Sequence, residues 1–501
     1  MFIINLIGFI FVLGLVILIH ELGHFLLAKR AGILCHEFAL GMGPILYSKK
    51  VGETRYSIRA FPIGGYVSMA GEEVQSSLVK NGDYVVLSFE DDVISHIQVV
   101  DENAEGAVRV DQVNLTGEDH ALSINHMPVD SKAMVKIKNS EIQIAPLNRS
   151  FGSKTLWERF LTIFAGPFMN FVLAYVIFVI ISFIVGFSVL DQAEIGTFNP
   201  NLPAASVLEV GDVVLNVNGQ PVSTWDDFTG FIRADKSVRV IELEVLRNNE
   251  RISTQITPRL FFYSVGLNSH PETIETVKIG PVVANTLAQQ AGFLEGDEII
   301  RINQQPIQSW ADLIEKLEAN QTGQLMTFTV LRNQEEKTLE IRPFEIAVLN
   351  TQSVPIVDVF IGVSPPTEFR FLPSFRQGAL GVFGASRLIF DTIGLLFNSS
   401  QVGVGDLAGP IGIFTLTSDA LAQGLVVFLN WIGLLSVNLG ILNLLPIPAL
   451  DGGRLVFLGY EGVTKKKINP KVENYLHLVM FFLLIGFFIF IAFNDISRLF
   501  N

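Results

Sequence analysis

Residues 2–28 read FIINLIGFIFVLGLVILIHELGHFLLA, and this stretch decides the fold class. The run exceeds the roughly 20 apolar residues that a helix needs to cross the ~30 Å hydrocarbon core of a bilayer. No basic residue precedes it and no small-residue cleavage site follows it, so it predicts a retained membrane span rather than a signal peptide. Near its end stand His20, Glu21 and His24, which are expensive to place in lipid and therefore indicate a functional site.

Three further runs have the same character, at residues 160–190, 425–445 and 475–493. The 501-residue chain is 49% hydrophobic and only 17% charged, a composition that excludes a disordered chain and an ordinary soluble enzyme. We therefore predict a multi-span α-helical membrane protein with four transmembrane helices. A fifth apolar stretch, residues 378–397, contains Arg387 and Asp391 at the spacing of a helical ion pair, which favours a helix lying on the membrane surface.

Charge and cysteine content exclude other classes. A net charge of −14 argues against a nucleic-acid partner, because no surface that neutralises phosphate is available. The single cysteine, Cys35, excludes an intrachain disulfide framework and a cysteine-based zinc site.

Basic residues gather beside the spans and predict their orientation. They are Lys29, Arg30, Lys49, Lys50, Lys154, Arg159, Arg454, Lys465, Lys466, Lys467 and Lys471. Such flanks are cytoplasmic, so residues from about 190 to 424 and both termini are expected outside. A fifth span at 378–397 would put the basic loop 451–471 on the wrong side.

Between the second and third spans the sequence repeats at a constant offset of 85 residues, as from Gly211 to Gly296. Each copy contains a Gly-Asp turn, a short apolar strand, a turn with Asn, a helix that opens near a Trp and a strand that ends in Arg-Asn. This order resembles the PDZ domain, so we predict two extracytoplasmic PDZ-like β/α domains that either bind extended peptides or act as a passive spacer. The first copy has no counterpart of Ala291-Gly292. The repeated elements are Gly211-Asp212 and Gly296-Asp297, Trp225 and Trp310, and Val245-Leu246-Arg247-Asn248 and Val330-Leu331-Arg332-Asn333.

Residues 73–150 form a separate cytoplasmic insert, predicted to be rich in β-strands. Short apolar runs at 85–87, 97–100, 134–138 and 141–144 are separated by Asn, Asp and Gly turns. Nothing in the insert indicates chemistry, and its role stays open.

The segment His20-Glu21-Leu22-Gly23-His24 is an HExxH pattern. Positions i and i+4 of a helix share one face about 5–6 Å apart, so two imidazoles can bind one metal ion. Glu21 can then reach a water molecule on that ion as a general base. The alternative is a polar patch that holds helices together.

Two His and one water leave a tetrahedral zinc site one protein ligand short. The candidate for the missing ligand is Asp451, which follows a third span that Pro446 and Pro448 interrupt. By the predicted topology, Asp451, His20 and His24 all lie near the cytoplasmic face. A plain helix-capping aspartate is the alternative for Asp451.

At these residues the chain resembles the site-2 protease family of intramembrane zinc metalloproteases, specifically the bacterial regulator of sigma E protease type. The motifs that carry the resemblance are HELGH, Gly41-Met42-Gly43-Pro44, Pro62-Ile63-Gly64-Gly65-Tyr66-Val67, Ala165-Gly166-Pro167-Phe168-Met169-Asn170, the PDZ-like pair and Pro446 to Gly453. Met42 stands where the family often has an aromatic residue, and the 73–150 insert is longer than in proteobacterial members.

The resemblance implies the roles of particular residues. One Zn²⁺ ion is bound by His20, His24 and Asp451, and Glu21 is the catalytic base. Substrate-binding residues are Asn443, Gly64, Gly65, Tyr66, Pro446 and Pro448. Residues 53–69 match a re-entrant β-hairpin that dips into the membrane and offers a strand edge to an unwound substrate.

The implied function is hydrolysis of peptide bonds inside the transmembrane segments of single-span proteins in the bacterial inner (plasma) membrane. Anti-sigma factors or signal-peptide remnants, first trimmed by an upstream site-1-type protease, are the expected substrates. A PDZ-bearing membrane scaffold or chaperone with an idle metal site is the alternative. A metal transporter is disfavoured because polar groups gather at one depth, and His477 is interpreted as a helix-packing residue.

The predicted division of the chain follows these motifs. It comprises a first transmembrane helix (1–30), a GxG loop and hairpin (31–72), the insert (73–150), a second helix (151–190), two PDZ-like domains (191–262 and 263–350), a linker with the interfacial helix (351–424), a third helix with the Leu-Asp-Gly-Gly motif (425–458) and a fourth helix (470–495).

Overall fold

The structure is a computed structural model that describes residues 1–71, 78–115, 122–137, 140–200, 202–234, 240–270, 276–283, 286–351, 354–399, 401–403, 405 and 407–500. The chain forms two compact units. The first comprises Met1–Ile180, Gly378–Ser386 and Ala408–Asn501, and the second comprises Ile181–Gln377 and Arg387–Leu407.

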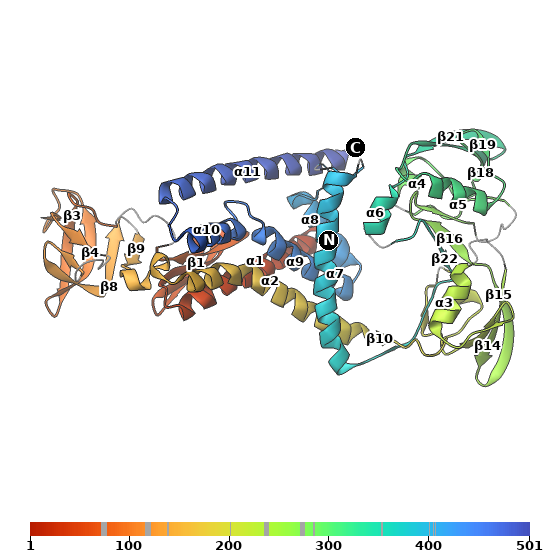
Figure 1. Cartoon of the computed structure of the whole chain (residues 1–501), viewed down its shortest axis with the longest axis horizontal. Helices are drawn as coiled ribbons and strands as arrows, with labels where there is room; N and C mark the ends of the chain where they lie inside the picture. The colour runs from red at the N-terminus through yellow and green to blue at the C-terminus, as the bar shows by residue number, and fades with distance from the viewer. Residues whose placement is uncertain are drawn as a thin grey trace. The chain divides into compact units, whose positions relative to one another are not determined.

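Five helices in the described residues are long and apolar enough to cross a membrane (Figure 1). Four of them correspond to the predicted spans, and the fifth, α7, has the lowest hydropathy of the set, at 1.5. The five are α1 (Phe2–Arg30), α2 (Leu156–Val185), α7 (Phe371–Asn398), α9 (Leu425–Leu444) and α11 (Pro470–Phe500). Two shorter helices, α8 (Pro410–Ala422) and α10 (Asp451–Thr464), flank α9.

Helices α1 and α2 cross in close contact at Gly23. A Cβ atom at Gly23 would lie 2.2 Å from the backbone oxygen of Ala165, and one at Gly166 would lie 2.2 Å from His24 Nε2. Only glycine allows this approach. The crossing therefore brings the HELGH turn of α1 against the first half of α2.

A long antiparallel hairpin follows α1. It consists of β1 (Cys35–Val51) and β2 (Thr54–Met69), with several register shifts along its length. The prediction that residues 53–69 match a hairpin was therefore wrong in its bounds, because these residues form β2 and the predicted GxG loop lies within β1. Glycine and proline normally interrupt strands, but here Gly41 (φ 87°) and Gly43 (φ 85°) lie within the irregular part of β1.

The insert is a small β-domain with its own core. Its sheet has the order β5-β3-β4-β8-β7-β6, with β9 paired to β8, and β4 and β8 run parallel. The predicted strands are present, and Lys138 lies outside the described residues. Alternate apolar side chains such as Val85, Ile97 and Val135 are fully buried. The strands are β3 (Tyr84–Glu90), β4 (Val93–Val100), β5 (Val108–Arg109), β6 (Val113–Asn114), β7 (Ser123–Ile124), β8 (Met127–Ile137) and β9 (Ser140–Gln143).

The second unit contains two four-stranded sheets of the same design, β13-β12-β14-β15 and β19-β18-β20-β21, each with one helix, α3 or α5. The main elements of the first copy are β12 (Val213–Val217), β13 (Gln220–Pro221), α3 (Trp225–Ala234), β14 (Ile241–Arg247) and β15 (Glu250–Ile256). Those of the second are β18 (Glu298–Ile302), β19 (Gln305–Pro306), α5 (Trp310–Ala319), β20 (Met326–Arg332) and β21 (Glu335–Ile341).

Ion pairs with a buried aspartate explain why the Asp of Gly-Asp and the Arg of Arg-Asn recur in both copies. Arg247 Nη2 lies 2.8 Å from Asp212 Oδ2, and Arg332 Nε lies 2.7 Å from Asp297 Oδ1. Burial opposes the charge on Asp212, but the hydrogen bonds from Arg247 and from the backbone N–H of Glu209 hold the pKa of this carboxyl below its ordinary value. The first pair ties the turn before β12 to the last residue of β14, and the second ties the turn before β18 to the last residue of β20.

Two pairs of short antiparallel strands join the first and last parts of the second unit. Strand β10 (Phe187–Ser188) pairs with β24 (Thr367–Glu368), and β11 (Thr197–Phe198) pairs with β23 (Val363–Ser364). A three-stranded sheet, β17-β16-β22, joins the two copies within one hydrophobic core. The remaining elements are β16 (Arg259–Phe262), β17 (Leu267–Asn268), β22 (Val357–Phe360), α4 (Leu287–Gln290) and α6 (Ile346–Thr351).

Candidate metal centre

Three side chains from two helices converge at one point in the first unit. His20 Nε2 lies 3.1 Å and His24 Nε2 lies 3.4 Å from Asp451 Oδ2, and the two Nε2 atoms are 3.2 Å apart. Both histidines are buried, with 7% and 8% exposure. The i, i+4 spacing on α1 places the two rings on one face, and Asp451 begins α10 opposite them.

The ring nitrogens that point away from this cluster are also engaged. His24 Nδ1 lies 2.9 Å from the backbone oxygen of Thr162 in α2, so it donates its proton there. His20 Nδ1 lies 3.1 Å from Nδ2 of Asn170. Asn170 is fully buried, and its Oδ1 has no hydrogen-bond partner among the described residues. The two ends of an amide exchange by a half-turn, and with Oδ1 facing the ring Asn170 accepts the Nδ1–H of His20. Both Nε2 atoms then present lone pairs to Asp451.

Helix α10 is fixed at both of its ends. Arg159 Nη2 in α2 lies 2.7 Å from Glu461 Oε1 in α10, and both side chains are largely buried. At the other end, a Cβ atom at Gly452 would lie 2.1 Å from the backbone oxygen of Leu445. The first turn of α10 therefore rests directly on the loop that leaves α9.

Glu21 lies between the cluster and the hairpin. A Cβ atom at Gly65 in β2 would stand 3.2 Å from Glu21 Cγ and 2.9 Å from the backbone oxygen of Ala39 in β1. The absence of a side chain at Gly65 thus lets the hairpin backbone approach the acidic side chain beside His20.

A polar network organises the hairpin next to this point. Glu37 in β1 accepts hydrogen bonds from Ser57 Oγ (2.5 Å), Arg59 Nη2 (2.7 Å) and Tyr66 Oη (3.0 Å). The guanidinium of Arg59 also lies 5.2 Å from the centroid of the Tyr66 ring. Tyr66, predicted to bind substrate, therefore directs its hydroxyl into the hairpin.

Charges clamp the turn of the hairpin to the end of α1 and to the insert. Glu53 Oε1 lies 2.6 Å from Lys29 Nζ and 2.8 Å from Arg149 Nη2. Burial alone would raise the pKa of Glu53, but the two cations hold it below its ordinary value. The clamp fixes the hairpin relative to the helix that carries HELGH.

The other predicted substrate-binding residues lie outside the cluster of His20, His24 and Asp451. Asn443 is half-buried on the last turn of α9, Pro446 is exposed and Pro448 is half-buried. Gly64 lies on β2, where an added Cβ would stand 3.0 Å from Met42 Cε. No sequence pattern assigns a role to Thr162, Asn170 or Glu37, because their partners are distant in sequence and no spacing links them.

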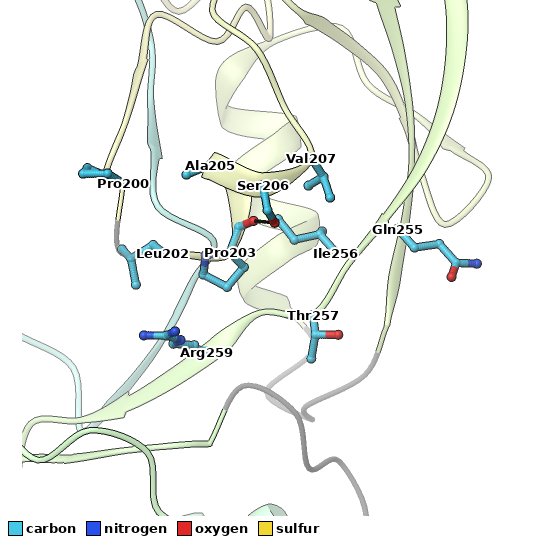
Figure 2. Close-up of a pocket in the computed structure, with 10 residues that line it drawn as sticks. All are labelled: Pro200, Leu202, Pro203, Ala205, Ser206, Val207, Gln255, Ile256, Thr257 and Arg259. Atoms are coloured by element: carbon cyan, nitrogen blue, oxygen red, sulfur yellow. Dashed lines mark hydrogen bonds between the residues drawn. The ribbon is translucent and has the colours of Figure 1, made fainter. Parts of the chain in front are cut away.

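The second unit contains a cavity of about 490 Å³ that none of the predicted site residues lines (Figure 2). Ser206 Oγ donates a hydrogen bond to the backbone oxygen of Pro203 at its wall. The lining residues are Pro200, Leu202, Pro203, Ala205, Ser206, Val207, Gln255, Ile256, Thr257 and Arg259.

Known proteins resemble this chain over nearly its whole length. The profile of peptidase family M50 matches residues 8–487. The chain is 32% identical to the zinc metalloprotease RasP of Oceanobacillus iheyensis, with 99% of each chain covered. It is 31% identical to the regulator of sigma-W protease RasP of Bacillus subtilis, with 100% of each covered. A solved PDZ domain of an SdrC-like protein from Listeria innocua matches 14% of this chain and 78% of its own, at 20% identity and a TM-score of 0.13, which is too slight to bear on the fold.

Proposed function

The chain belongs to peptidase family M50 and is a membrane-integrated zinc metalloprotease of the site-2 protease type, and on this premise we propose that His20, His24 and Asp451 hold its zinc ion. The observation that carries the proposal is the convergence of two Nε2 atoms and one carboxylate oxygen within 3.1–3.4 Å.

The donor set fits zinc. Two imidazole nitrogens and a carboxylate oxygen are ligands that catalytic zinc takes, with a further position left for water or substrate. Asp451 Oδ2 is buried without a hydrogen-bond partner among the described residues, and His24 directs its N–H away from it to Thr162. With the Asn170 amide turned so that Oδ1 faces the ring, His20 does the same. Three lone-pair atoms that face one another repel unless a cation lies among them. Ligating histidines characteristically donate their other N–H to a carbonyl or carboxylate, as His24 does to Thr162.

Glu21 is proposed as the general base. Bound zinc lowers the pKa of water to about 7 and polarises a carbonyl group. The Glu21 carboxylate takes the proton of the attacking water and delivers it to the amine of the departing peptide. Its position beside His20 and against Gly65 puts the base next to both the ligands and the hairpin.

The hairpin is proposed to hold the substrate as an added strand. The amides of a transmembrane helix are already hydrogen-bonded, so a substrate must unwind before a carbonyl can reach the centre. An extended segment can then pair with a hairpin edge at Gly64 and Gly65. Asn443, Pro446 and Pro448, which leave α9 just before Asp451, are proposed to contact the same segment.

A four-span topology remains our proposal for the membrane, with α1, α2, α9 and α11 as spans and the PDZ-like pair outside. Helix α7 is proposed to lie on the outer surface. It has the lowest hydropathy of the five candidates, and its Arg387 and Asp391 form an exposed ion pair 3.4 Å apart. Its Gly378 packs on Val179, in the half of α2 that this topology directs outward. The metal centre then lies near the cytoplasmic face.

The proposed substrates are single-span membrane proteins that an upstream site-1-type protease has already trimmed. Anti-sigma factors are favoured because a relative of similar length is named a regulator of sigma-W protease, and signal-peptide remnants share the same chemistry. The scaffold hypothesis loses its basis as a sole function, since the family is enzymatic.

The experiment compares wild type with Glu21→Gln, each purified in detergent and given a model single-span substrate. The amide cannot accept a proton but leaves all three ligands intact, so the variant should keep one zinc per chain and lose cleavage. Loss of zinc from this variant, or retained cleavage, would show that Glu21 has another role.

A further inference from the structure

The loop before Asp451 contains an alanine in a conformation that alanine disfavours. The N–H of Leu450 donates to the oxygen of Ile447 at 3.1 Å, which closes a turn with Pro448 and Ala449 at its centre. Ala449 has φ 86°. Proline second and a positive φ third characterise a type II turn, whose third position normally takes Gly or Asn. In the described residues, the other non-glycine positions with positive φ hold Asn, Asp, Gln, His or Lys, so Ala449 requires a separate stabilising contact.

His477 of α11 supplies a contact of the right kind. The backbone N–H of Ala449 donates to His477 Nδ1 at 2.9 Å. This N–H belongs to the central peptide of the turn, which is the group whose direction differs between type I and type II turns. The His477 ring also packs edge-on against Phe457 of α10, with centroids 5.7 Å apart. One side chain therefore contacts the turn and the helix that Asp451 begins.

The conformation of the turn is transmitted directly to the first turn of α10. A Cβ atom at Gly453 would lie 2.4 Å from the backbone oxygen of Ile447 and 2.8 Å from Pro448 Cα. Backbone packed this closely cannot rearrange on one side alone. A reoriented Pro448–Ala449 peptide would therefore change the surface on which the start of α10 rests.

We infer that His477 is a positioning residue for the metal centre: it holds the Ile447–Leu450 turn in the type II form and thereby sets the position of Asp451. The inference rests on the proposed role of Asp451 as a zinc ligand. It goes beyond the interpretation of His477 as a helix-packing residue, because it assigns the function to the hydrogen bond that Nδ1 accepts.

The test measures the zinc dissociation constant of the full-length protein in detergent by competition with a chromogenic chelator. His477→Leu removes the acceptor and should weaken zinc binding roughly tenfold, at the lower end of the effect of outer contacts on metal sites. His477→Asn keeps an acceptor at the position of Nδ1 and should bind zinc like wild type. Ala449→Gly with His477→Leu should regain most of the loss, because glycine adopts a positive φ without a steric penalty.

Phe457→Leu is the matched control, since it alters packing on the His477 ring and leaves the acceptor in place. It should bind zinc like wild type. Unchanged affinity in His477→Leu would overturn the inference, and so would a failure of Ala449→Gly to restore it or a loss in Phe457→Leu as large as that in His477→Leu. Asp451→Ala separates a failure of the proposed ligand set from a failure of the proposed role of His477. If Asp451→Ala retains zinc, both proposals are wrong. If Asp451→Ala loses zinc and His477→Leu does not, only the role of His477 is wrong.

Discussion

Asn170→Leu tests whether the contact behind His20 matters for the metal centre. Asn170 is fully buried and lies 3.1 Å from His20 Nδ1, and leucine of similar size cannot accept a hydrogen bond. A buried N–H left without an acceptor costs about 1–3 kcal/mol. With roughly 1.4 kcal/mol for each factor of ten, this predicts zinc binding about 5- to 140-fold weaker, a range that includes the effect of outer contacts at other metal sites.

The assay is chelator competition on the purified full-length protein, with two controls. Asn170→Asp keeps an acceptor and should bind zinc at least as tightly as wild type. Ser436→Ala removes a hydrogen bond from Ser436 Oγ in α9 to the backbone oxygen of Asn170, at 2.8 Å. It therefore loosens a different contact of the same residue without touching His20. Its affinity should be unchanged. Wild-type affinity in Asn170→Leu, or an equal loss in Ser436→Ala, would show that the contact between Asn170 and His20 does not support the metal centre.

Three further predictions concern the rest of the chain. Cysteines placed at Asn248 and at Asp91, both in exposed turns, should label differently in intact spheroplasts: a membrane-impermeant reagent should reach Asn248→Cys only, and the reverse pattern would invert the proposed topology. Deleting residues 191–364 removes the PDZ-like pair but keeps the pairing of β10 with β24. If the PDZ-like pair excludes bulky substrates, the deletion variant should cleave single-span proteins with large outside domains and still cut short-tailed substrates as before. Slower cleavage of the short-tailed substrates would indicate that the pair captures substrates instead. Because Arg247 holds the pKa of Asp212 below its ordinary value, the stability that this pair adds is fully present above the unfolded pKa of about 3.9 and is lost as the pH falls toward the pKa of folded Asp212. Acid unfolding of the second unit should therefore be steeper in wild type than in Asp212→Asn. Identical unfolding profiles would contradict this prediction.

The sequence identifies the candidate spans and the proposed metal ligands because both depend on local patterns. A long apolar run is sufficient for a candidate span. The HELGH spacing fixes two histidines on one helical face, and the prolines before Asp451 mark the end of α9. The proposed topology puts His20, His24 and Asp451 at one depth, and in the structure their ligand atoms lie 3.1–3.4 Å from one another.

Other features escaped prediction because they depend on tertiary contacts. Strand β1 contains Gly41 and Gly43, which locally favour a turn, and only pairing with β2 keeps them in an irregular strand. The contact between Asn170 and His20 joins residues 150 positions apart, and that between His477 and Ala449 joins residues 28 apart. Neither has a sequence spacing that would identify it.

X-ray absorption at the zinc edge would identify the zinc ligands themselves, which we propose to be His20, His24 and Asp451. The zinc-loaded protein should show only nitrogen and oxygen neighbours at about 2.0–2.2 Å, with the outer scattering of two imidazoles. Asp451→Ala should alter the first shell and keep both imidazoles. A sulfur neighbour near 2.3 Å, which would require Cys35, or scattering from fewer than two imidazoles in the wild type would contradict the account.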